Sequence, residues 1–150
     1  MAKKKDRSGI ATDDLDLARE LGAQDSYARQ CLTVYVPNKD KNDVEIGNQR
    51  KWVLEALALL TELNGGATAM PPTEGVWGNE QGQLIWEHPV VVYSFVVRPS
   101  AFRKNLPRIR EFLHRMGRET NQGEVAFEFE NRFYLIRDYD PPTQPNGDTK

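Results

Sequence analysis

Residues 84–97, LIWEHPVVVYSFVV, form the most β-prone run of the chain and decide its fold. Val, Ile, Tyr, Phe and Trp fill both alternating sets of positions, and these residue types are enriched in strands. The run is long enough to be the central strand of a sheet. A strand that is apolar on both alternations is buried on both faces, so the sequence predicts a sheet that is covered on each side.

A strand and a helix are predicted before this run. Residues 31–37, CLTVYVP, alternate in the manner of a strand and end at a proline. Asn48 then caps a helix through Leu63 that carries a wide apolar stripe. The helix is predicted to stop at Gly65-Gly66, because glycine adopts the left-handed conformation after a helix at least cost.

A second strand is predicted between this helix and the opening run. It begins with ATAM at 67–70, is interrupted by two prolines, and resumes at 74–77. Residues 78–82, GNEQG, are predicted to be a loose turn.

A second helix and a hairpin are predicted after residue 97. Ser100 caps the helix, and Pro107 is expected to kink it or to mark its true start one turn later. Residues 125–129, VAFEF, alternate as a strand, and 133–136, FYLI, return as a short one.

The predicted order is therefore β-α-β-β-α-β, with an extra C-terminal hairpin strand and a short N-terminal helix within 12–29, capped by Thr12. This order is typical of the split-βαβ, ferredoxin-like fold, an α+β architecture in which two helices pack on one face of an antiparallel sheet. The core is predicted to span 31–136. Folds of this type host unrelated functions.

A looser sequence resemblance concerns a few short motifs. GGAT at 65–68, GVW at 75–77, a strand with an early glutamate and QGEVAFEF at 122–129 resemble the pattern of a group of small uncharacterised bacterial proteins. The resemblance implies no activity and carries no site residues over.

Length and composition predict one domain. The chain has 150 residues, and we expect a single domain over 12–140 with disordered tails at 1–11 and 141–150. Cys31 is the only cysteine, so no disulfide can form within the chain. No apolar run reaches membrane-spanning length and no signal peptide is evident, which predicts a cytoplasmic protein without membrane contact.

The first candidate site is a set of polar residues around the predicted 78–82 turn. Glu74 and Glu87 would approach each other if their strands pair, with Trp77 and His88 nearby. Paired carboxylates beside an imidazole suit acid–base work or a divalent cation, although no spacing in the sequence supports a metal site. The alternative is an ordinary hairpin end. His88 would point to the opposite face from Glu87 unless Pro89 distorts the strand.

The second candidate is the basic face of the helix predicted over 100–118. Its cations recur at helical spacing and could bind an anionic ligand or a nucleic-acid backbone; they are Lys104, Arg108, Arg115 and Arg118. The alternative is a solvated face whose charges pair with the glutamates of 119–130. The net charge of −2 gives no global attraction to nucleic acid.

The third candidate is the sheet face opposite the helices, which is predicted to present Thr33, Tyr35, Tyr93 and Phe95. The N-terminal helix, a second subunit or a ligand would have to cover such a face. We expect a homodimer formed through the sheet.

These patterns rank three functions. A non-enzymatic binding or regulatory module acting as a homodimer comes first. A small acid–base or metal-dependent enzyme using Glu74 and Glu87 comes second, and a nucleic-acid-associated protein using the basic helix comes third. No cofactor is predicted.

Overall fold

The structure is a computed structural model that describes residues 16–24 and 29–144. The predicted tail at 1–11, the Thr12 cap and residues 145–150 lie outside the described residues. Helix α1 (Leu17–Leu21) begins after Asp16, whose carboxylate accepts the Arg19 N–H at 3.1 Å, so the predicted short N-terminal helix is present.

A five-stranded antiparallel sheet forms the centre of the fold. Its order is β2 (Thr68–Ala69), β5 (Val90–Phe95), β1 (Cys31–Val36), β6 (Val125–Phe129) and β7 (Arg132–Ile136). The expectation of an α+β protein with an antiparallel sheet is confirmed. The central strand is β1, which pairs with β5 on one side and β6 on the other.

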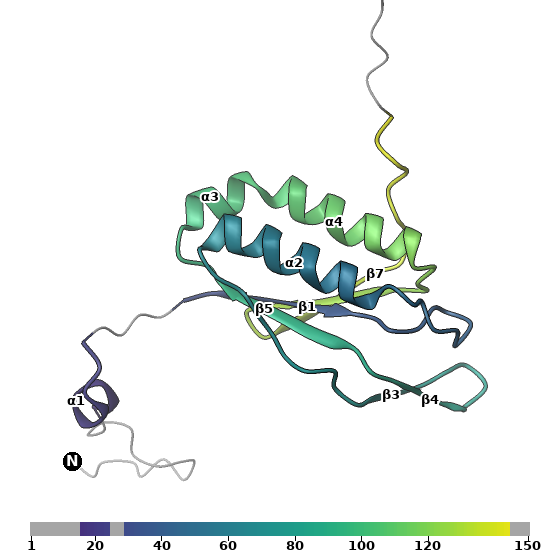
Figure 1. The fold of residues 1–150 in the computed structure, drawn as a ribbon, viewed down its shortest axis with the longest axis horizontal. Helices are drawn as coiled ribbons and strands as arrows, with labels where there is room; N and C mark the ends of the chain where they lie inside the picture. The colour runs from purple at the N-terminus through teal and green to yellow at the C-terminus, as the bar shows by residue number, and fades with distance from the viewer. Residues whose placement is uncertain (1–15, 25–28, 145–150) are drawn as a thin grey trace, which may run out of the picture.

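The helices α2 (Gln49–Asn64), α3 (Pro99–Lys104) and α4 (Leu106–Glu119) all cover the same face of the sheet, as Figure 1 shows. The core lies between these two layers. Leu32, Val34 and Val36 point into it from β1, and Trp52 and Met116 fill it from the helices with no exposed surface. Burial of these large apolar side chains is the main driving force for the fold.

The helix ends follow the chemistry of their residues. Gly65 ends α2 with a φ of 85°, the left-handed conformation that glycine adopts without strain. Asn105 separates α3 from α4, and Pro107 lies in the first turn of α4, where its missing N–H costs nothing. The predicted helix start near Pro107 is confirmed.

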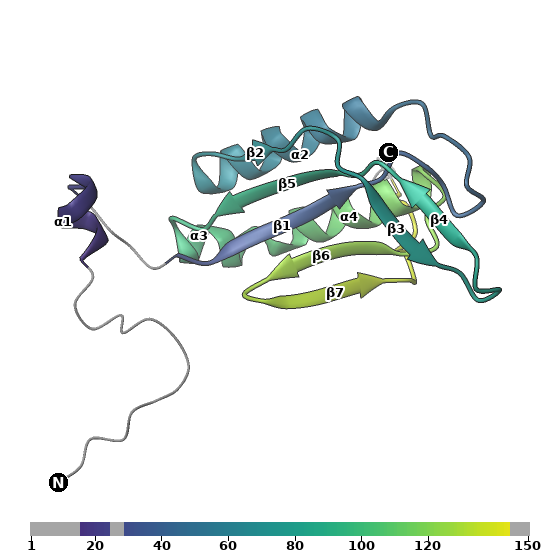
Figure 2. The same ribbon diagram turned by 90° about the horizontal axis from the view of Figure 1, so that it is seen from below.

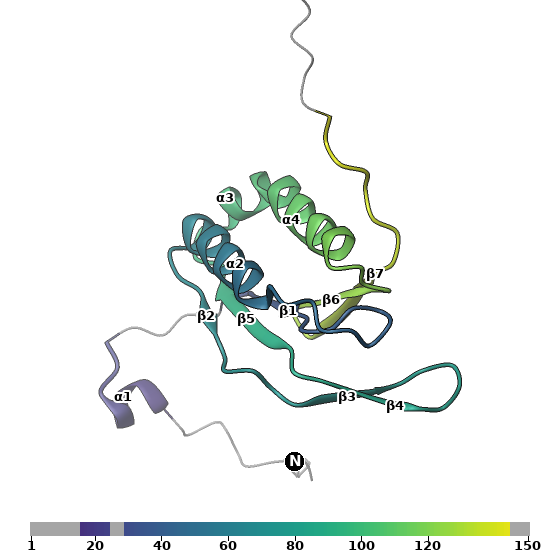
Figure 3. The ribbon, with the colours of Figure 1, turned by 45° about the vertical axis from the view of Figure 1, so that its right-hand side comes forward.

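The run 84–97 is not one strand, and this part of the prediction is wrong. His88 and Pro89 divide it into β4 (Leu84–Glu87) and β5. The reason is that Pro89 has no N–H for a sheet ladder and restricts the backbone of His88. Strand β4 instead pairs with β3 (Gly75–Gly78) in a separate two-stranded hairpin, which extends from the body of the molecule in Figure 3.

Within the described residues, the second face of the sheet carries no helix. Figure 2 looks onto this face, with the helices behind it. Leu17 and Leu21 of α1 are 57% and 78% exposed, so α1, one of the three alternatives for covering this face, does not bury its leucines there. Of the helices in the described part of the chain, none is long and apolar enough to cross a membrane.

Candidate active site

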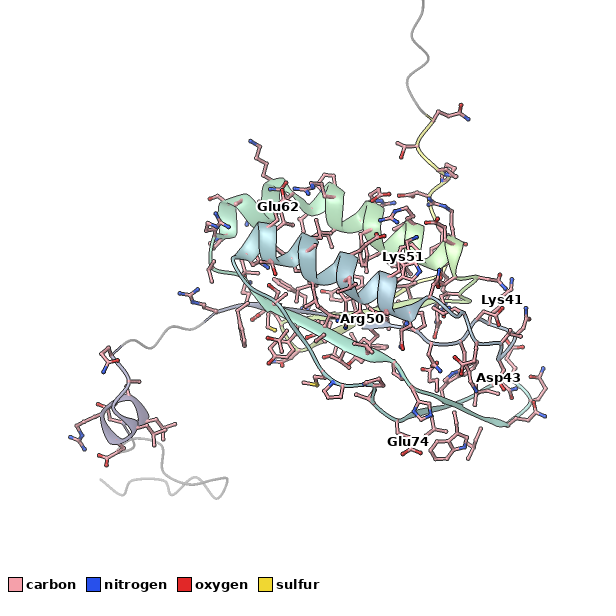
Figure 4. The ribbon with its side chains drawn as sticks, in the orientation of Figure 1. Lys41, Asp43, Arg50, Lys51, Glu62 and Glu74 are labelled. Carbon is pink, nitrogen blue, oxygen red and sulfur yellow. The ribbon has the colours of Figure 1, made fainter. Side chains whose placement is uncertain are left out.

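The β3–β4 hairpin determines which polar side chains can meet. Gly75 pairs with Glu87 and Trp77 pairs with Ile85, so these four residues share one face. Thr73 N–H donates to the Pro89 carbonyl at 2.9 Å, which continues the same register through position 74. Alternation then places Glu74 on the other face, and Figure 4 shows Glu74 pointing away from the molecule.

The predicted pairing of Glu74 with Glu87 is therefore not formed. Glu87 pairs with Gly75, the residue after Glu74, and neighbouring residues of a strand point to opposite faces. His88 also lies on the opposite side from Glu87, and its Nδ1 is 3.1 Å from the Thr73 carbonyl oxygen. Of the four predicted residues, Glu87 and Trp77 therefore share one face, and Glu74 and His88 lie on the other.

The base of the hairpin is fixed by the loop that follows β1. The Asn38 side chain, 7% exposed, accepts the backbone N–H of His88 at 2.8 Å and donates to both carboxylate oxygens of Glu45 at 3.1 and 3.2 Å. Gln49, at the start of α2, donates to the His88 carbonyl at 2.9 Å and to the Val36 carbonyl at 3.1 Å. Glu87, the residue before His88, is therefore held on a well-anchored segment.

Glu87 has an unusual environment for a surface strand. Its side chain is partly buried, and this burial raises its pKa above the usual glutamate range, against the opposing effects of a hydrogen bond from Trp77 and the positive charge of Lys39. A carboxyl group with a raised pKa exchanges protons closer to neutral pH than an exposed glutamate does.

Lys39 brings a cation to this site and is itself well held. Its Nζ donates to Asp43 at 2.8 Å and to the Trp86 carbonyl at 3.0 Å, so it joins the loop to strand β4. The hydrogen bond with Asp43 raises the pKa of Lys39, which keeps it charged. The site thus combines a carboxyl, an indole ring and a charged ammonium group that is paired with a carboxylate.

Asn38 and Lys39 are not among the site residues that the sequence predicts, because the segment 38–47 lies between a strand and a helix in the manner of an ordinary loop. The available signal was its composition. NKDKNDVEIG contains five charged residues and two asparagines between a strand and a helix, and a polar loop beside a hairpin is a common place for functional groups.

The basic face that the sequence predicts over 100–118 lies on α3 and α4, and two of its arginines form ion pairs. Arg108 makes a two-pronged bond to Glu62 at 2.8 and 2.9 Å, and Arg115 donates to Glu55 at 2.6 Å. Both of these carboxylates, Glu62 and Glu55, are on α2. The predicted alternative was pairing with the glutamates of 119–130, and of these only Glu119 lies near the face, 3.7 Å from Arg115.

The remaining two cations of that face differ in their contacts. Arg118 donates to the backbone carbonyl of Asp140 in the segment after β7, and Lys104 lies at the exposed end of α3. An anion that approached this face would compete with carboxylates for Arg108 and Arg115.

The predicted sheet-face residues do lie together, on the face without helices. Thr33, Tyr35 and Tyr93 are half-buried and Phe95 is 50% exposed. The Tyr35 hydroxyl donates to Glu128 at 2.6 Å, and burial together with this hydrogen bond raises the pKa of Tyr35 to about 12. Among the described residues, no group of three or more His, Cys, Asp or Glu could hold a metal ion.

Comparison with known proteins gives similarity of structure alone. No protein-family model matches the chain, and no curated protein is similar to it in sequence. A solved structure of a phage SAM lyase in complex with S-methyl-5'-thioadenosine is similar in fold, with a TM-score of 0.51, 13% identity, and coverage of 77% of this chain and 95% of that chain.

A solved structure of a phage SAM lyase in its apo state is also similar in fold, with a TM-score of 0.52, 15% identity, and coverage of 75% of this chain and 92% of that chain. The first-ranked expectation, a non-enzymatic binding module, is contradicted by these neighbours, which are enzymes.

Proposed function

We propose that this chain is an enzyme acting on a sulfonium substrate of the S-adenosylmethionine type, with Glu87 as its central acid–base residue. The observation that carries the proposal is the partly buried Glu87 carboxyl, with its raised pKa, beside the indole of Trp77. The fold supports the choice of substrate, since the similar solved structures are SAM lyases.

The chemistry of the site suits a cationic sulfur. S-Adenosylmethionine carries a permanent positive charge on its sulfur atom, and cations bind to the faces of tryptophan rings and to carboxylates. Trp77 is 45% exposed and shares a hairpin face with Glu87. Lys39 would repel a cation less than a free lysine would, because Asp43 pairs with it at 2.8 Å.

The reaction can be written from substrate and product. S-Methyl-5'-thioadenosine keeps the sulfur, the methyl group and the adenosyl group, so the bond that breaks joins the sulfur to the aminobutyrate chain. In an elimination, a base removes a proton from the carbon next to the one bonded to sulfur. The electron pair forms a carbon–carbon double bond, and the sulfur leaves as a neutral thioether.

Glu87 is the residue placed to act as that base. Its carboxylate would attract the sulfonium and then accept the proton, and a raised pKa makes it a stronger base than an exposed glutamate. The direct test is incubation of the purified protein with S-adenosylmethionine, followed by chromatography and mass spectrometry. We expect S-methyl-5'-thioadenosine to form faster than in a protein-free control; equal amounts in both would reject the proposal.

We also infer a ferredoxin-like core. The strand order β2-β5-β1-β6 supports it, with α2 connecting β1 to β2 and α3–α4 connecting β5 to β6 on one face. Strand β7 is the extra hairpin strand, and β3–β4 is an insertion between β2 and β5.

Three further expectations stay predictions. A homodimer through the open sheet face is supported by the exposure of Phe95 and Phe133, 50% and 60%, and sedimentation equilibrium tests it. A cytoplasmic location and an anionic ligand at the basic helix are the other two.

A further inference from the structure

A cleft of about 630 Å³ opens between the helices α3–α4 and the hairpin β6–β7, away from the residues used above. Its size falls in the range of small-molecule sites, roughly 300–1,000 Å³. The lining is largely apolar and includes Leu106, Ile109, Leu113, Phe127 and Tyr134.

Two stacked pairs of aromatic rings line this cleft. Phe127 stacks on Tyr134 with ring centroids 4.8 Å apart and planes 7° from parallel. Phe102 of α3 stacks on Phe129 at 5.7 Å and 11°. Rings arranged in this way suit a planar aromatic ligand, because offset stacking adds to the gain from burying apolar surface.

His114 supplies a buried polar group to the same cleft. It is 5% exposed, and its Nδ1 accepts the backbone N–H of Asp140 at 2.8 Å. Since Nδ1 is the acceptor, the proton of the neutral ring is on Nε2.

The Nε2 group of His114 has no hydrogen-bond partner in the described part of the chain. The polar side-chain atoms in that part of the chain that are fully buried without a partner belong to Trp52, Asn64 and Tyr139, so His114 Nε2 is not fully buried. The ring therefore keeps a small accessible surface, and His114 is one of the residues that line the cleft. A donor in such an apolar place is unfavourable unless an acceptor meets it.

A cation lies beside this donor. Arg110 also lines the cleft, and it binds Asp140 through Nε and Nη2 at 2.7 and 2.9 Å. Its Nη1 is left for another acceptor. An anionic acceptor is therefore favoured over a neutral one.

We propose that this cleft binds a small aromatic carboxylate. The ring would lie against the Phe127–Tyr134 and Phe102–Phe129 pairs, and the carboxylate would accept the N–H of His114 Nε2 with Arg110 alongside. The proposal is independent of the lyase activity, and its test uses no S-adenosylmethionine.

The probe is 1-naphthoate, titrated against the full-length protein by NMR. We expect saturable shifts, and nuclear Overhauser contacts between the naphthalene protons and the rings of Phe127 and Tyr134. Leu106→Trp fills the mouth of the cleft and should abolish the shifts. Leu54→Trp is the matched control, an exposed leucine on α2 that does not line the cleft, and should bind as the wild type does.

His114→Asn tests the donor. Asn can keep an acceptor for the Asp140 N–H but has no group at the position of Nε2, so we expect affinity for 1-naphthoate to fall about tenfold. Unchanged affinity in this variant would overturn the role of His114. Absence of contacts to Phe127 and Tyr134 in the wild type would overturn the site itself, whether or not the variants fold.

Discussion

Trp77 and Glu87 lie diagonally across the β3–β4 hairpin on the same face, where hydrogen bonding from the indole opposes the rise in the pKa of the Glu87 carboxyl. This bond and the charge of Lys39 lower the pKa of Glu87, while burial raises it by more. The carboxyl is thus oriented by one neighbour and kept partly out of water by the fold, which is the arrangement an acid–base residue needs.

Trp77→Phe should raise the pKa of Glu87 further. The substitution removes the hydrogen bond that favours the charged carboxylate and leaves the burial that disfavours it. The measurement is an NMR pH titration of the Glu87 carboxyl carbon. Trp86→Phe is the control, since Trp86 lies on the other hairpin face; an equal shift in both variants would contradict the account.

Asp140 should contribute stability that is lost in acid. The hydrogen bond from Arg110, with the charges of Arg110 and Arg118, lowers the pKa of this carboxyl below its unfolded value. Its contribution is therefore present above the unfolded pKa of about 3.9 and disappears as pH falls through the folded pKa. Asp140→Asn should flatten the fall in unfolding free energy below about pH 5, measured by urea denaturation.

The control for this prediction is Asp138→Asn, which removes a charge from the same C-terminal segment. We expect it to keep the acid dependence of the wild type. If both variants lose the same part of that dependence, the ion pair between Arg110 and Asp140 is not its origin.

Gly117→Ala should destabilise the protein through the C-terminal segment. A Cβ at Gly117 would come within 2.2 Å of Tyr139 Cε1, so the ring would have to move, at a cost of about 1–3 kcal/mol. In a Tyr139→Ala background the same change should stabilise, because alanine is favoured over glycine within a helix by about 1 kcal/mol. The free energy of unfolding of the four proteins is measured with denaturant. An effect of Gly117→Ala with the same sign in both backgrounds would contradict the contact.

Asn38→Ala should loosen the base of the hairpin. The substitution leaves the His88 N–H without its acceptor, and losing a buried hydrogen-bond partner costs about 1–3 kcal/mol. Hydrogen exchange of the His88 amide should become faster. Asn42→Ala, on the exposed part of the same loop, is the control. Unaltered exchange at His88 in the Asn38 variant would show that the loop does not hold the hairpin.

Much of the fold is predictable because its signals are local. Helix α2 ends where Gly65 permits the left-handed turn, and α4 begins where Pro107 fits the first turn. The alternation of 31–36 also gives the correct buried face of β1. The break at His88-Pro89 was visible in the sequence, but the strong β-propensity on either side outweighed it in the prediction.

The candidate site was only partly predictable, because it depends on pairing between distant segments. Glu74 and Glu87 are equivalent candidates in the sequence, and only the register of the hairpin separates their faces. Likewise, Arg108 and Arg115 find their carboxylates on α2, far along the chain. Composition identifies such groups but does not give their partners.

The most direct test of the central proposal compares two glutamates of one hairpin. The initial rate of S-methyl-5'-thioadenosine formation from S-adenosylmethionine is measured for the wild type, Glu87→Gln and Glu74→Gln. We predict that Glu87→Gln lowers the rate by about 10²–10⁴-fold, the usual contribution of an acid–base residue, and that Glu74→Gln leaves it unchanged. No product from the wild type, or equal rates for all three proteins, would contradict the proposal.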